Sequence, residues 1–388
     1  MKVADVAIIG AGVIGTSLAL ELANEKLSVS LFDRQQPGRE ASWAAAGMLS
    51  PGPDSAEALP LVPLAKESMR LYPEFIAAIE EMSGRSVGFA RKGTLEVFPG
   101  ANAEAQRDRM VAEYRSLGFS VDPITIAAAR KAEPALGTAA QAAAWLPQEA
   151  TLDPRLLIEA LLLAAKNCGV DLHADAPVGR LTISGNHCTG ISTAEKNISA
   201  KCVIVAAGCY SGGIDWLARY APTRPIRGQL LALETKNPLL QRTLRSSKAY
   251  LVPRAGGRLI AGSTLEEAGF EKHVTPAGVR KILDGVLELA PSLANARLVD
   301  AWAGLRPATP DLLPAIGPTD IRGLYIATGH YRNGVLLAPA TAKAITAWIL
   351  GGKPAMDIGA FSPLRFGETK PHATRTASAK TSSLSEFD

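Results

Sequence analysis

VADVAIIGAGVIGTSLALELANEKLSVSLFD occupies residues 3–33 and contains two apolar runs separated by a helical pattern. Residues 3–10 are apolar and rich in β-branched side chains, so they predict a buried strand. Residues 12–25 have the apolar spacing of a helix, and residues 28–33 predict a second strand. A strand, a helix and a strand in this order begin a parallel sheet, which predicts a fold of the α/β class.

Gly10, Gly12 and Gly15 connect the first strand to the helix with the spacing of a dinucleotide-binding loop. These glycines permit a tight turn, bring the backbone close to a pyrophosphate and let the helix pack against the strand. Val13 and Ile14 place further backbone N–H groups at the helix N-terminus, which favours an anion. A glycine-rich turn without a ligand is the alternative, but the complete strand, loop and helix pattern favours a cofactor site.

The second strand ends in Asp33, where an acid can accept hydrogen bonds from a ribose. Arg34 follows at the expected adenosine end of the site. Because NAD and FAD sites share this fingerprint, the fingerprint alone leaves the choice of cofactor open.

The rest of the chain predicts two interleaved domains. Strand and helix patterns in residues 1–84, 146–222 and 300–366 predict a discontinuous, Rossmann-type cofactor domain. Residues 85–145 and 223–299 contain short strand patterns and turn residues, which predict a second domain with a mixed or antiparallel sheet for the substrate. The tail from about residue 367 to 388 is rich in Ser, Thr, Ala and Lys, a composition that predicts disorder.

Several elements have clear local signals. Residues 152–169 predict a helix with Asp153 as its N-cap, and residues 64–82 predict a helix that Pro73 kinks or divides. Residues 323–329 predict a further buried strand.

Composition excludes several classes of protein. The chain has 388 residues, of which 47% are hydrophobic and 20% charged, so it can bury a large core. A net charge of +4 is too small to favour a nucleic-acid-binding protein. No stretch approaches the ~20 uninterrupted apolar residues of a membrane span. The four cysteines lack the spacing of a zinc site, and their scatter fits a reducing compartment, so we expect a cytoplasmic protein without a metal site.

Seven stretches together resemble one family. They are GAGVIG (10–15), EASWAAAGML (40–49), VIVAAG (203–208), YLVPR (250–254), GSTLEEAGF (262–270), WAGLRPATPD (302–311) and GHYRNGVLLAPAT (329–341). In this order they resemble the FAD-dependent D-amino-acid and amine oxidases, and within that family the glycine oxidases of the thiamine pathway. The resemblance covers nearly the whole chain before the tail and implies FAD as the cofactor.

The resemblance also implies a set of FAD contacts beyond the glycine loop. They are Ser42, Ala46, Gly47, Met48, Val178, Ala207, Gly208, His330, Tyr331, Arg332, Asn333, Gly334, Val335 and Leu336. For Val178, whose backbone would meet the adenine, ordinary packing is an equally good interpretation.

For the substrate, the resemblance implies a carboxylate clamp made by Arg306, with Tyr250 donating its hydroxyl to the same carboxylate and Arg332 lying beside flavin and substrate. An arginine suits this role because its planar guanidinium binds both carboxylate oxygens. Each residue has a structural alternative: Arg306 as an ion pair between domains, and Tyr250 as a half-buried strand residue.

Two positions depart from the family. Leu265 stands where relatives carry methionine, a change that conserves volume. Gly304 lies near the place where some sarcosine-oxidase relatives attach flavin to a cysteine, so we expect non-covalent FAD.

The resemblance implies oxidative deamination of glycine or a similar small amine, such as sarcosine or a small D-amino acid, to an imine and then a 2-oxo acid. Flavin accepts the hydride and performs the chemistry, so no side chain is expected to act as a catalytic acid or base. Oxygen is the expected electron acceptor, with hydrogen peroxide as product, and a homo-oligomer such as a tetramer is the expected assembly. The alternatives are a dehydrogenase that passes electrons to a carrier, a non-catalytic flavin-binding protein and an NAD-dependent dehydrogenase.

Overall fold

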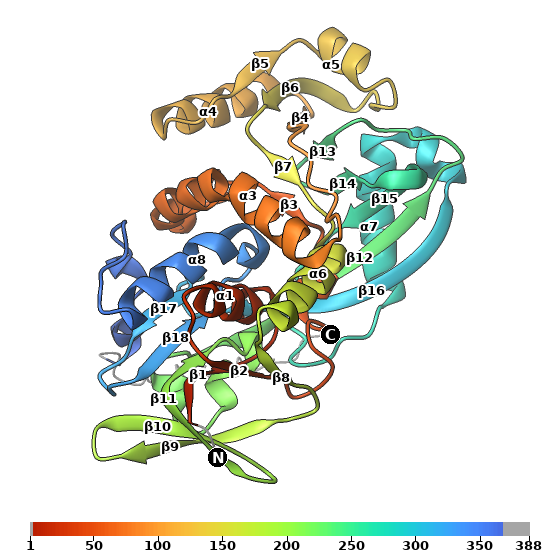
Figure 1. Ribbon diagram of the computed structural model, residues 1–388. Coiled ribbons are helices and arrows are strands. Elements are labelled where there is room, and N and C mark those ends of the chain that lie inside the picture. Colours follow the sequence, from red (N-terminus) through yellow and green to blue (C-terminus); the bar gives the residue numbers. More distant parts are fainter. Residues whose placement is uncertain (1–2, 368–388) are drawn as a thin grey trace, which may run out of the picture.

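The computed structural model describes residues 3–367, which build two large sheets and the helices packed on them (Figure 1). The first sheet has the strand order β17-β18-β11-β1-β2-β8, and β10 and β9 continue from β11. Its strands are β1 (Ala4–Ile9), β2 (Val29–Phe32), β8 (Asp171–His173), β9 (Val178–Ser184), β10 (His187–Thr193), β11 (Asn197–Val205), β17 (Ala315–Pro318) and β18 (Leu324–Thr328). β8, β2, β1, β11 and β18 are parallel, which confirms the predicted α/β architecture.

Four helices cover one face of this sheet (Figure 1). They are α1 (Val13–Asn24), α3 (Val62–Ser83), α6 (Pro154–Asn167) and α8 (Gly334–Ile349). β1 alternates accordingly: Val6 and Ile8 pack in the core with these helices, whereas Ala7 and Ile9 belong to the core on the opposite face. Side chains buried on both faces explain why the strand reads as an almost continuous apolar run.

The helix predictions from local signals are confirmed in outline. α6 begins after Asp153, whose carboxylate accepts a hydrogen bond from the backbone N–H of Arg155 at 2.9 Å. α3 runs through Pro73 as one helix, so the predicted division there is wrong. The packing of α3 against α8 and α6 outweighs the backbone hydrogen bond that Pro73 removes.

The second sheet is mixed, as predicted, with the order β16-β12-β15-β14-β13-β4-β6-β5. Its strands are β4 (Thr94–Pro99), β5 (Asp122–Ile124), β6 (Ala140–Leu146), β12 (Arg224–Glu234), β13 (Thr243–Arg245), β14 (Tyr250–Pro253), β15 (Arg258–Gly262) and β16 (Arg297–Ala308). The pair β13 and β4 is parallel and the other neighbours are antiparallel.

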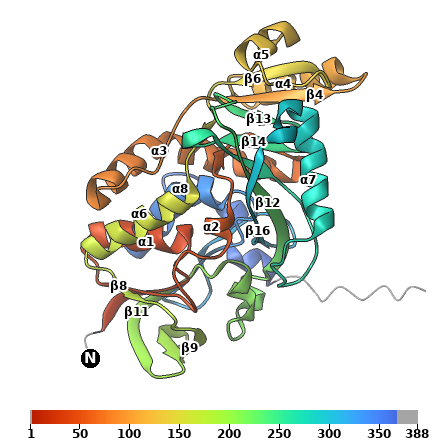
Figure 2. The same cartoon turned by 90° about the vertical axis from the view of Figure 1, so that its right-hand side faces the viewer.

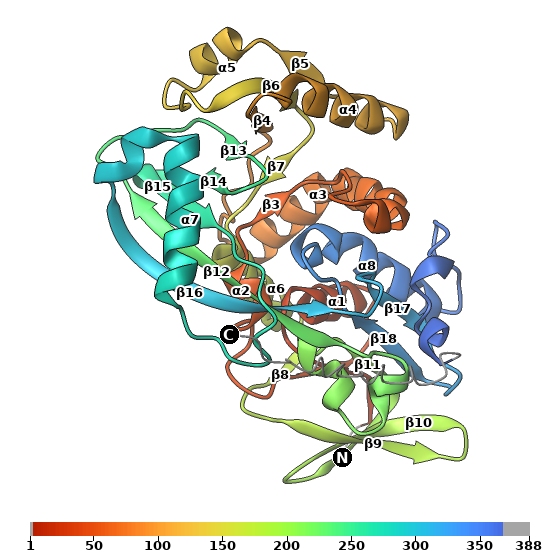
Figure 3. The same ribbon diagram turned by 180° about the vertical axis from the view of Figure 1, so that it is seen from behind.

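The two faces of this sheet have different partners. Leu231 and Leu233 of β12 pack with α7 (Pro276–Leu289), which lies along the outer face of the sheet (Figure 3). Leu230 and Ala232 point the other way and pack with Ala44 of the short helix α2 (Ala41–Ala44). The inner face of the sheet therefore faces the cofactor-type domain.

The remaining elements join the two sheets or extend the second one. α4 (Ala103–Ser116) and α5 (Ile126–Ala132) lie with β4, β5 and β6 at one end of the molecule (Figure 2). β3 (Met48–Leu49) and β7 (Ala150–Thr151) form a two-stranded sheet.

The predicted domain boundaries stay predictions. β16 runs across the predicted boundary between residues 299 and 300. The predicted disordered tail lies outside the described residues, apart from residue 367 itself. Among the helices of residues 3–367, none combines the length and the apolar character needed to cross a lipid bilayer.

Candidate active site

A cavity of about 1420 Å³ lies between the first sheet and the inner face of the second. All residues that the sequence analysis selected for cofactor or substrate line this cavity, apart from Gly15. They come from segments as far apart in sequence as Gly10 and Leu336. The structure therefore brings the predicted residues together, while the role of each one stays a prediction.

The glycine loop has the geometry of a phosphate cradle. Gly10 has a φ of 103°, and an added Cβ would lie 2.5 Å from the carbonyl oxygen of Ala206. Gly15 is outside the cavity because it packs α1 against β1: an added Cβ would lie 1.8 Å from the carbonyl oxygen of Gly10. At Gly12 an added Cβ would lie 3.2 Å from Ser42 Oγ, so the loop surface there is held free of side chains. These residues fit a dinucleotide cofactor, whose pyrophosphate they would hold at the N-terminus of α1.

Two polar side chains hold this loop. The backbone N–H of Val13 donates to Ser42 Oγ at 2.9 Å, which links the loop to α2. The backbone N–H of Ala11 donates to a carboxylate oxygen of Asp33 at 2.9 Å, and that of Gln35 donates to the other oxygen at 3.1 Å. Burial raises the pKa of Asp33, which lies at the strand end where a ribose hydroxyl is expected.

An aromatic stack closes the expected adenosine end of the cavity. The Arg34 guanidinium lies 3.4 Å from the ring centroid of Tyr210, and the Tyr210 ring stacks on Phe270 at 4.9 Å. Glu40 pairs with Arg34 at 2.7 Å and with Lys272 at 3.1 Å. Phe270 and Lys272 belong to the segment between β15 and α7, so the second domain reaches across the cofactor site here. Arg34 was predicted from the sequence, and the other members of this stack were not.

The segment at residues 44–48 presents little side-chain bulk to the cavity. Gly47 has a φ of 74°, and an added Cβ would lie 2.0 Å from the carbonyl oxygen of Leu152. Trp302 Nε1 donates to the carbonyl oxygen of Ala44 at 3.0 Å and ties the segment to the second sheet. At Gly304 an added Cβ would lie 2.4 Å from the Cβ of Ala44, because the segment packs directly on β16. Such a surface fits a flat ring system.

The start of α8 is held by hydroxyl groups from α3. Pro339 lacks the N–H that would bond the carbonyl group of Val335, and the buried Tyr72 hydroxyl donates to that carbonyl oxygen instead. Ser68 Oγ donates to the carbonyl oxygen of Leu336 at 2.6 Å. These bonds fix the first turn of α8, which borders the cavity.

His330 is a buried, neutral residue in this wall. Its side chain is 3% exposed, and burial lowers its pKa to about 3. Its Nε2 lies 3.1 Å from Thr341 Oγ1. His330 therefore adds no charge to the cavity at neutral pH.

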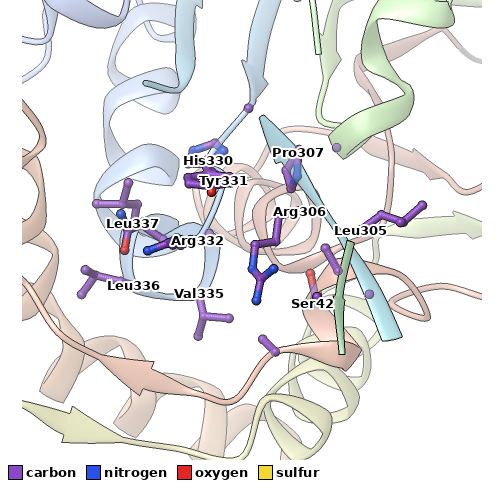
Figure 4. A pocket seen from close by; sticks show the side chains of 18 of the residues that line it. Ser42, Leu305, Arg306, Pro307, His330, Tyr331, Arg332, Val335, Leu336 and Leu337 are labelled. Carbon is purple, nitrogen blue, oxygen red and sulfur yellow. The ribbon is translucent and has the colours of Figure 1, made fainter. Parts of the chain in front are cut away.

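Arg306 is distinguished by its surroundings. Among the described residues, four arginines line the cavity, and three of them are paired: Arg34 with Glu40, Arg332 with Asp54, and Arg245 with Glu96 and Glu149. Within residues 3–367, Arg306 has no carboxylate partner, and it extends into the open space of the pocket (Figure 4). Burial lowers its pKa, yet a guanidinium remains charged in a protein. A partly buried cation without an anion is well suited to bind the carboxylate of a ligand.

Tyr250 lies close to Arg306 on the inner face of the second sheet. Its hydroxyl lies over Gly262, where an added Cβ would be 2.5 Å from the Tyr250 oxygen. Burial raises the pKa of Tyr250, so the phenol stays protonated and can donate a hydrogen bond. Leu265 also lines the cavity and is 50% exposed.

Arg332 lies opposite Arg306, at the turn before α8 (Figure 4). It pairs with Asp54 at 2.5 Å, and the two side chains are 42% and 51% exposed. The structure therefore places Arg332 in the cavity wall, but its guanidinium is already occupied by a carboxylate.

Three positions around Arg306 were not predicted from the sequence: Ser263, Thr264 and Gly228. Ser263 and Thr264 lie inside the GSTLEEAGF stretch, which was the only signal for them. No motif indicates Gly228, since it matters only because the Arg306 side chain of the neighbouring strand β16 lies over it.

Comparisons with known proteins identify the family of the chain. The sequence model of the family described as FAD dependent oxidoreductase matches residues 5–348. The glycine oxidase of Geobacillus kaustophilus is 33% identical over 369 residues, which cover 93% of this chain and 97% of that protein. The bifunctional protein ThiO/ThiG of Synechocystis sp. is 33% identical over 93% of this chain and 54% of its own length. A crystal structure of glycine oxidase from Geobacillus kaustophilus superposes with a TM-score of 0.90 at 31% identity and covers 94% of this chain and 99% of that chain.

Proposed function

Because the chain belongs to the FAD-dependent oxidoreductases, we propose that it oxidises glycine or a similar small amine, such as sarcosine or a small D-amino acid, with non-covalent FAD as its cofactor. The similarity to glycine oxidase over nearly the full length of both chains supports this substrate class. The unpaired Arg306 is the observation on which the proposal rests, because a small amino acid supplies the missing carboxylate.

The reaction is a two-electron oxidation of the amine. The substrate loses a hydride from its α-carbon and a proton from its nitrogen, and the resulting imine reacts with water to give a 2-oxo acid and ammonia, or methylamine when the substrate is sarcosine. Bound FAD would supply the oxidising chemistry as the hydride acceptor. Oxygen would take up the two electrons and two protons and leave as hydrogen peroxide.

The chain's own contribution is to bind and orient the substrate. Arg306 would bind the carboxylate, and the protonated Tyr250 hydroxyl would donate to the same group. Both side chains project from the inner face of the second sheet, so they hold the substrate on the side of the cavity opposite the turn before α8. Because the bound substrate is held in a fixed orientation beside the cofactor site, the reaction no longer depends on a random encounter, which lowers its entropic barrier.

Aerobic turnover tests the proposal directly. Purified protein with FAD is given glycine, sarcosine and small D-amino acids, and hydrogen peroxide, ammonia and 2-oxo acid are measured. We expect equal amounts of the three products from glycine. Substrate loss without peroxide would indicate a dehydrogenase that uses a carrier, and no reaction with any carboxylated small amine would contradict the proposal.

We extend the proposal to thiamine (thiazole) biosynthesis, which the family resemblance implies and the similarity to a ThiO/ThiG protein supports. Growth of a deletion strain without thiamine, with and without the cloned gene, tests this role. The same proposal includes a cytoplasmic location and a homo-oligomer such as a tetramer. Light scattering during size-exclusion chromatography measures the assembly.

A further inference from the structure

Ser263 follows the last residue of β15 and contacts the guanidinium of Arg306. Arg306 Nη2 donates to Ser263 Oγ at 2.9 Å, and Arg306 Nη1 donates to the carbonyl oxygen of Thr264 at 3.1 Å. These are the only hydrogen bonds of the Arg306 side chain in the part of the chain that the structure describes. They fix the orientation of the guanidinium and leave N–H groups on both terminal nitrogens for a ligand.

Ser263 also lies beside Tyr250. It follows Gly262, the register partner of Tyr250, and its hydroxyl lowers the pKa of Tyr250 against the larger opposing effect of burial, so Ser263 lies between Arg306 and Tyr250. A guanidinium can only donate, and Ser263 Oγ must therefore accept from Arg306. Its own hydrogen is then free to point to the Tyr250 oxygen, which leaves the phenol hydrogen of Tyr250 for a ligand in the cavity.

Two glycines make room for this arrangement. At Gly228 an added Cβ would lie 2.1 Å from Arg306 Nη1, and at Gly262 it would lie 2.5 Å from the Tyr250 oxygen. Tyr250 and Gly262 are register partners on β14 and β15, and Gly262 is also paired with Leu230 of β12. The Arg306 side chain, from β16, therefore lies over β12, and the Tyr250 side chain, from β14, lies over β15. β12 and β15 are neighbours, and Ser263 follows the end of β15.

We propose that Ser263 is a positioning residue for the substrate carboxylate, because its hydroxyl orients Arg306 and Tyr250 toward the same ligand. Its ligand class is a small carboxylate, and the inference rests on the proposed function for the identity of the amine attached to it. Ser263 touches neither the reacting carbon nor the reacting nitrogen in this arrangement, so its removal affects binding more than turnover.

A matched pair of variants isolates the hydroxyl group. Ser263→Thr keeps the hydroxyl on a branched side chain, and Ser263→Val has nearly the same shape without it. The probe is acetate, a carboxylate without an amine, and its Kd is measured from the change in the flavin absorbance spectrum of the FAD-bound protein. We expect Ser263→Val to raise the acetate Kd about tenfold, as the loss of one hydrogen bond to a charged group does, and Ser263→Thr to stay within about twofold of wild type.

Kinetics and a double variant give a second readout. Ser263→Val should raise KM for glycine by a similar factor with kcat nearly unchanged. Combining Ser263→Val with Tyr250→Phe should weaken acetate binding by less than the product of the two single effects, because both hydroxyls serve one carboxylate. Ser192→Ala, which removes a hydroxyl from the distant strand β10, is the control and should change neither constant.

Equal acetate affinity in Ser263→Thr and Ser263→Val, or fully independent effects of the two hydroxyls, would overturn the inference. If the valine variant fails to bind FAD, Ser263→Ala removes the hydroxyl without added bulk and is judged by the same criterion. Acetate binding needs no turnover, so a wild-type protein that binds acetate but ignores glycine would contradict the proposed function and leave the role of Ser263 standing.

Discussion

Arg306 and Arg332 line the same cavity in different electrostatic surroundings. Arg332 is paired with Asp54 in a half-exposed position, whereas Arg306 has no acidic partner among residues 3–367. An exposed ion pair contributes little free energy, since solvent screens both charges. The two arginines should therefore differ in their importance for substrate binding, although the sequence motifs present both in the same way.

We expect Arg332→Ala to raise KM for glycine by less than about tenfold, because the cation it removes is half exposed and already neutralised. Steady-state kinetics of Arg332→Ala and Arg306→Ala, compared at equal FAD content, measure the difference. A larger effect at Arg332 than at Arg306 would show that Asp54 releases Arg332 to the substrate.

Individual residues could be identified from the sequence where their role depends on neighbouring residues or on a recognisable motif. Gly10, Gly12 and Asp33 were predictable from the fingerprint because the chemistry of a phosphate turn depends on neighbouring residues. The bond from the Tyr72 hydroxyl to the carbonyl group of Val335 was not predictable. The sequence shows that Pro339 lacks a backbone N–H donor, but only the packing of α3 on α8 shows which hydroxyl replaces that donor.

Among the elements, α1 depends most directly on a single glycine. An added Cβ at Gly15 would lie 1.8 Å from the carbonyl oxygen of Gly10, and no flexible side chain is available to move aside. We expect Gly15→Ala to displace α1 from β1 and to abolish FAD binding, seen as loss of flavin absorbance after gel filtration. Gly179→Ala on β9, where an added Cβ meets nothing within 4 Å, is the control and should retain FAD. Full FAD content in Gly15→Ala would contradict this packing argument.

The segment between β15 and α7 crosses the adenosine end of the cavity and stacks Phe270 on Tyr210. An aromatic pair contributes about 0.5–1.5 kcal/mol beyond the area that it buries. We expect Phe270→Ala to release FAD up to about tenfold faster, measured by the recovery of flavin fluorescence after dilution.

Leu364→Ala is the control for this experiment, because Leu364 is an exposed apolar residue that does not line the cavity. An unchanged release rate in Phe270→Ala would mean that this segment does not retain the cofactor.

The elements themselves were predicted better than their pairing. The strands at Ala4–Ile9 and Leu324–Thr328 have clear apolar patterns and lie where expected. β16 extends across the predicted boundary of the second domain because it pairs with β12 along its length. Pairing of strands that are distant in sequence is a tertiary property, so local patterns did not reveal it.

For the whole molecule, His330 links stability to pH. Burial lowers its pKa from 6.5 to about 3, so between these values the unfolded state binds one more proton than the folded state. Stability therefore falls as pH falls through this range. From pH 7 to pH 5 the contribution of His330 is a loss of about 2 kcal/mol.

We expect His330→Gln to lose less stability than wild type over the same pH range, because the variant has no group that titrates there. The free energy of unfolding from urea denaturation at pH 7 and pH 5 gives the difference, and other titrating groups cancel between the proteins. His187→Gln at an exposed position is the control. Identical pH slopes for wild type and His330→Gln would show that the imidazole is not buried as a neutral group.

In the proposed function, the unpaired Arg306 binds the carboxylate of a small amino acid beside FAD. Anaerobic reduction of the bound flavin by increasing glycine, followed by absorbance in wild type and in Arg306→Ala, tests this claim most directly. Wild type should be reduced, and the variant should need roughly 100-fold more glycine for the same rate, since losing the partner of a charged ligand group costs about 3 kcal/mol. The same glycine dependence in both proteins, or a wild-type flavin that glycine leaves oxidised, would contradict the account.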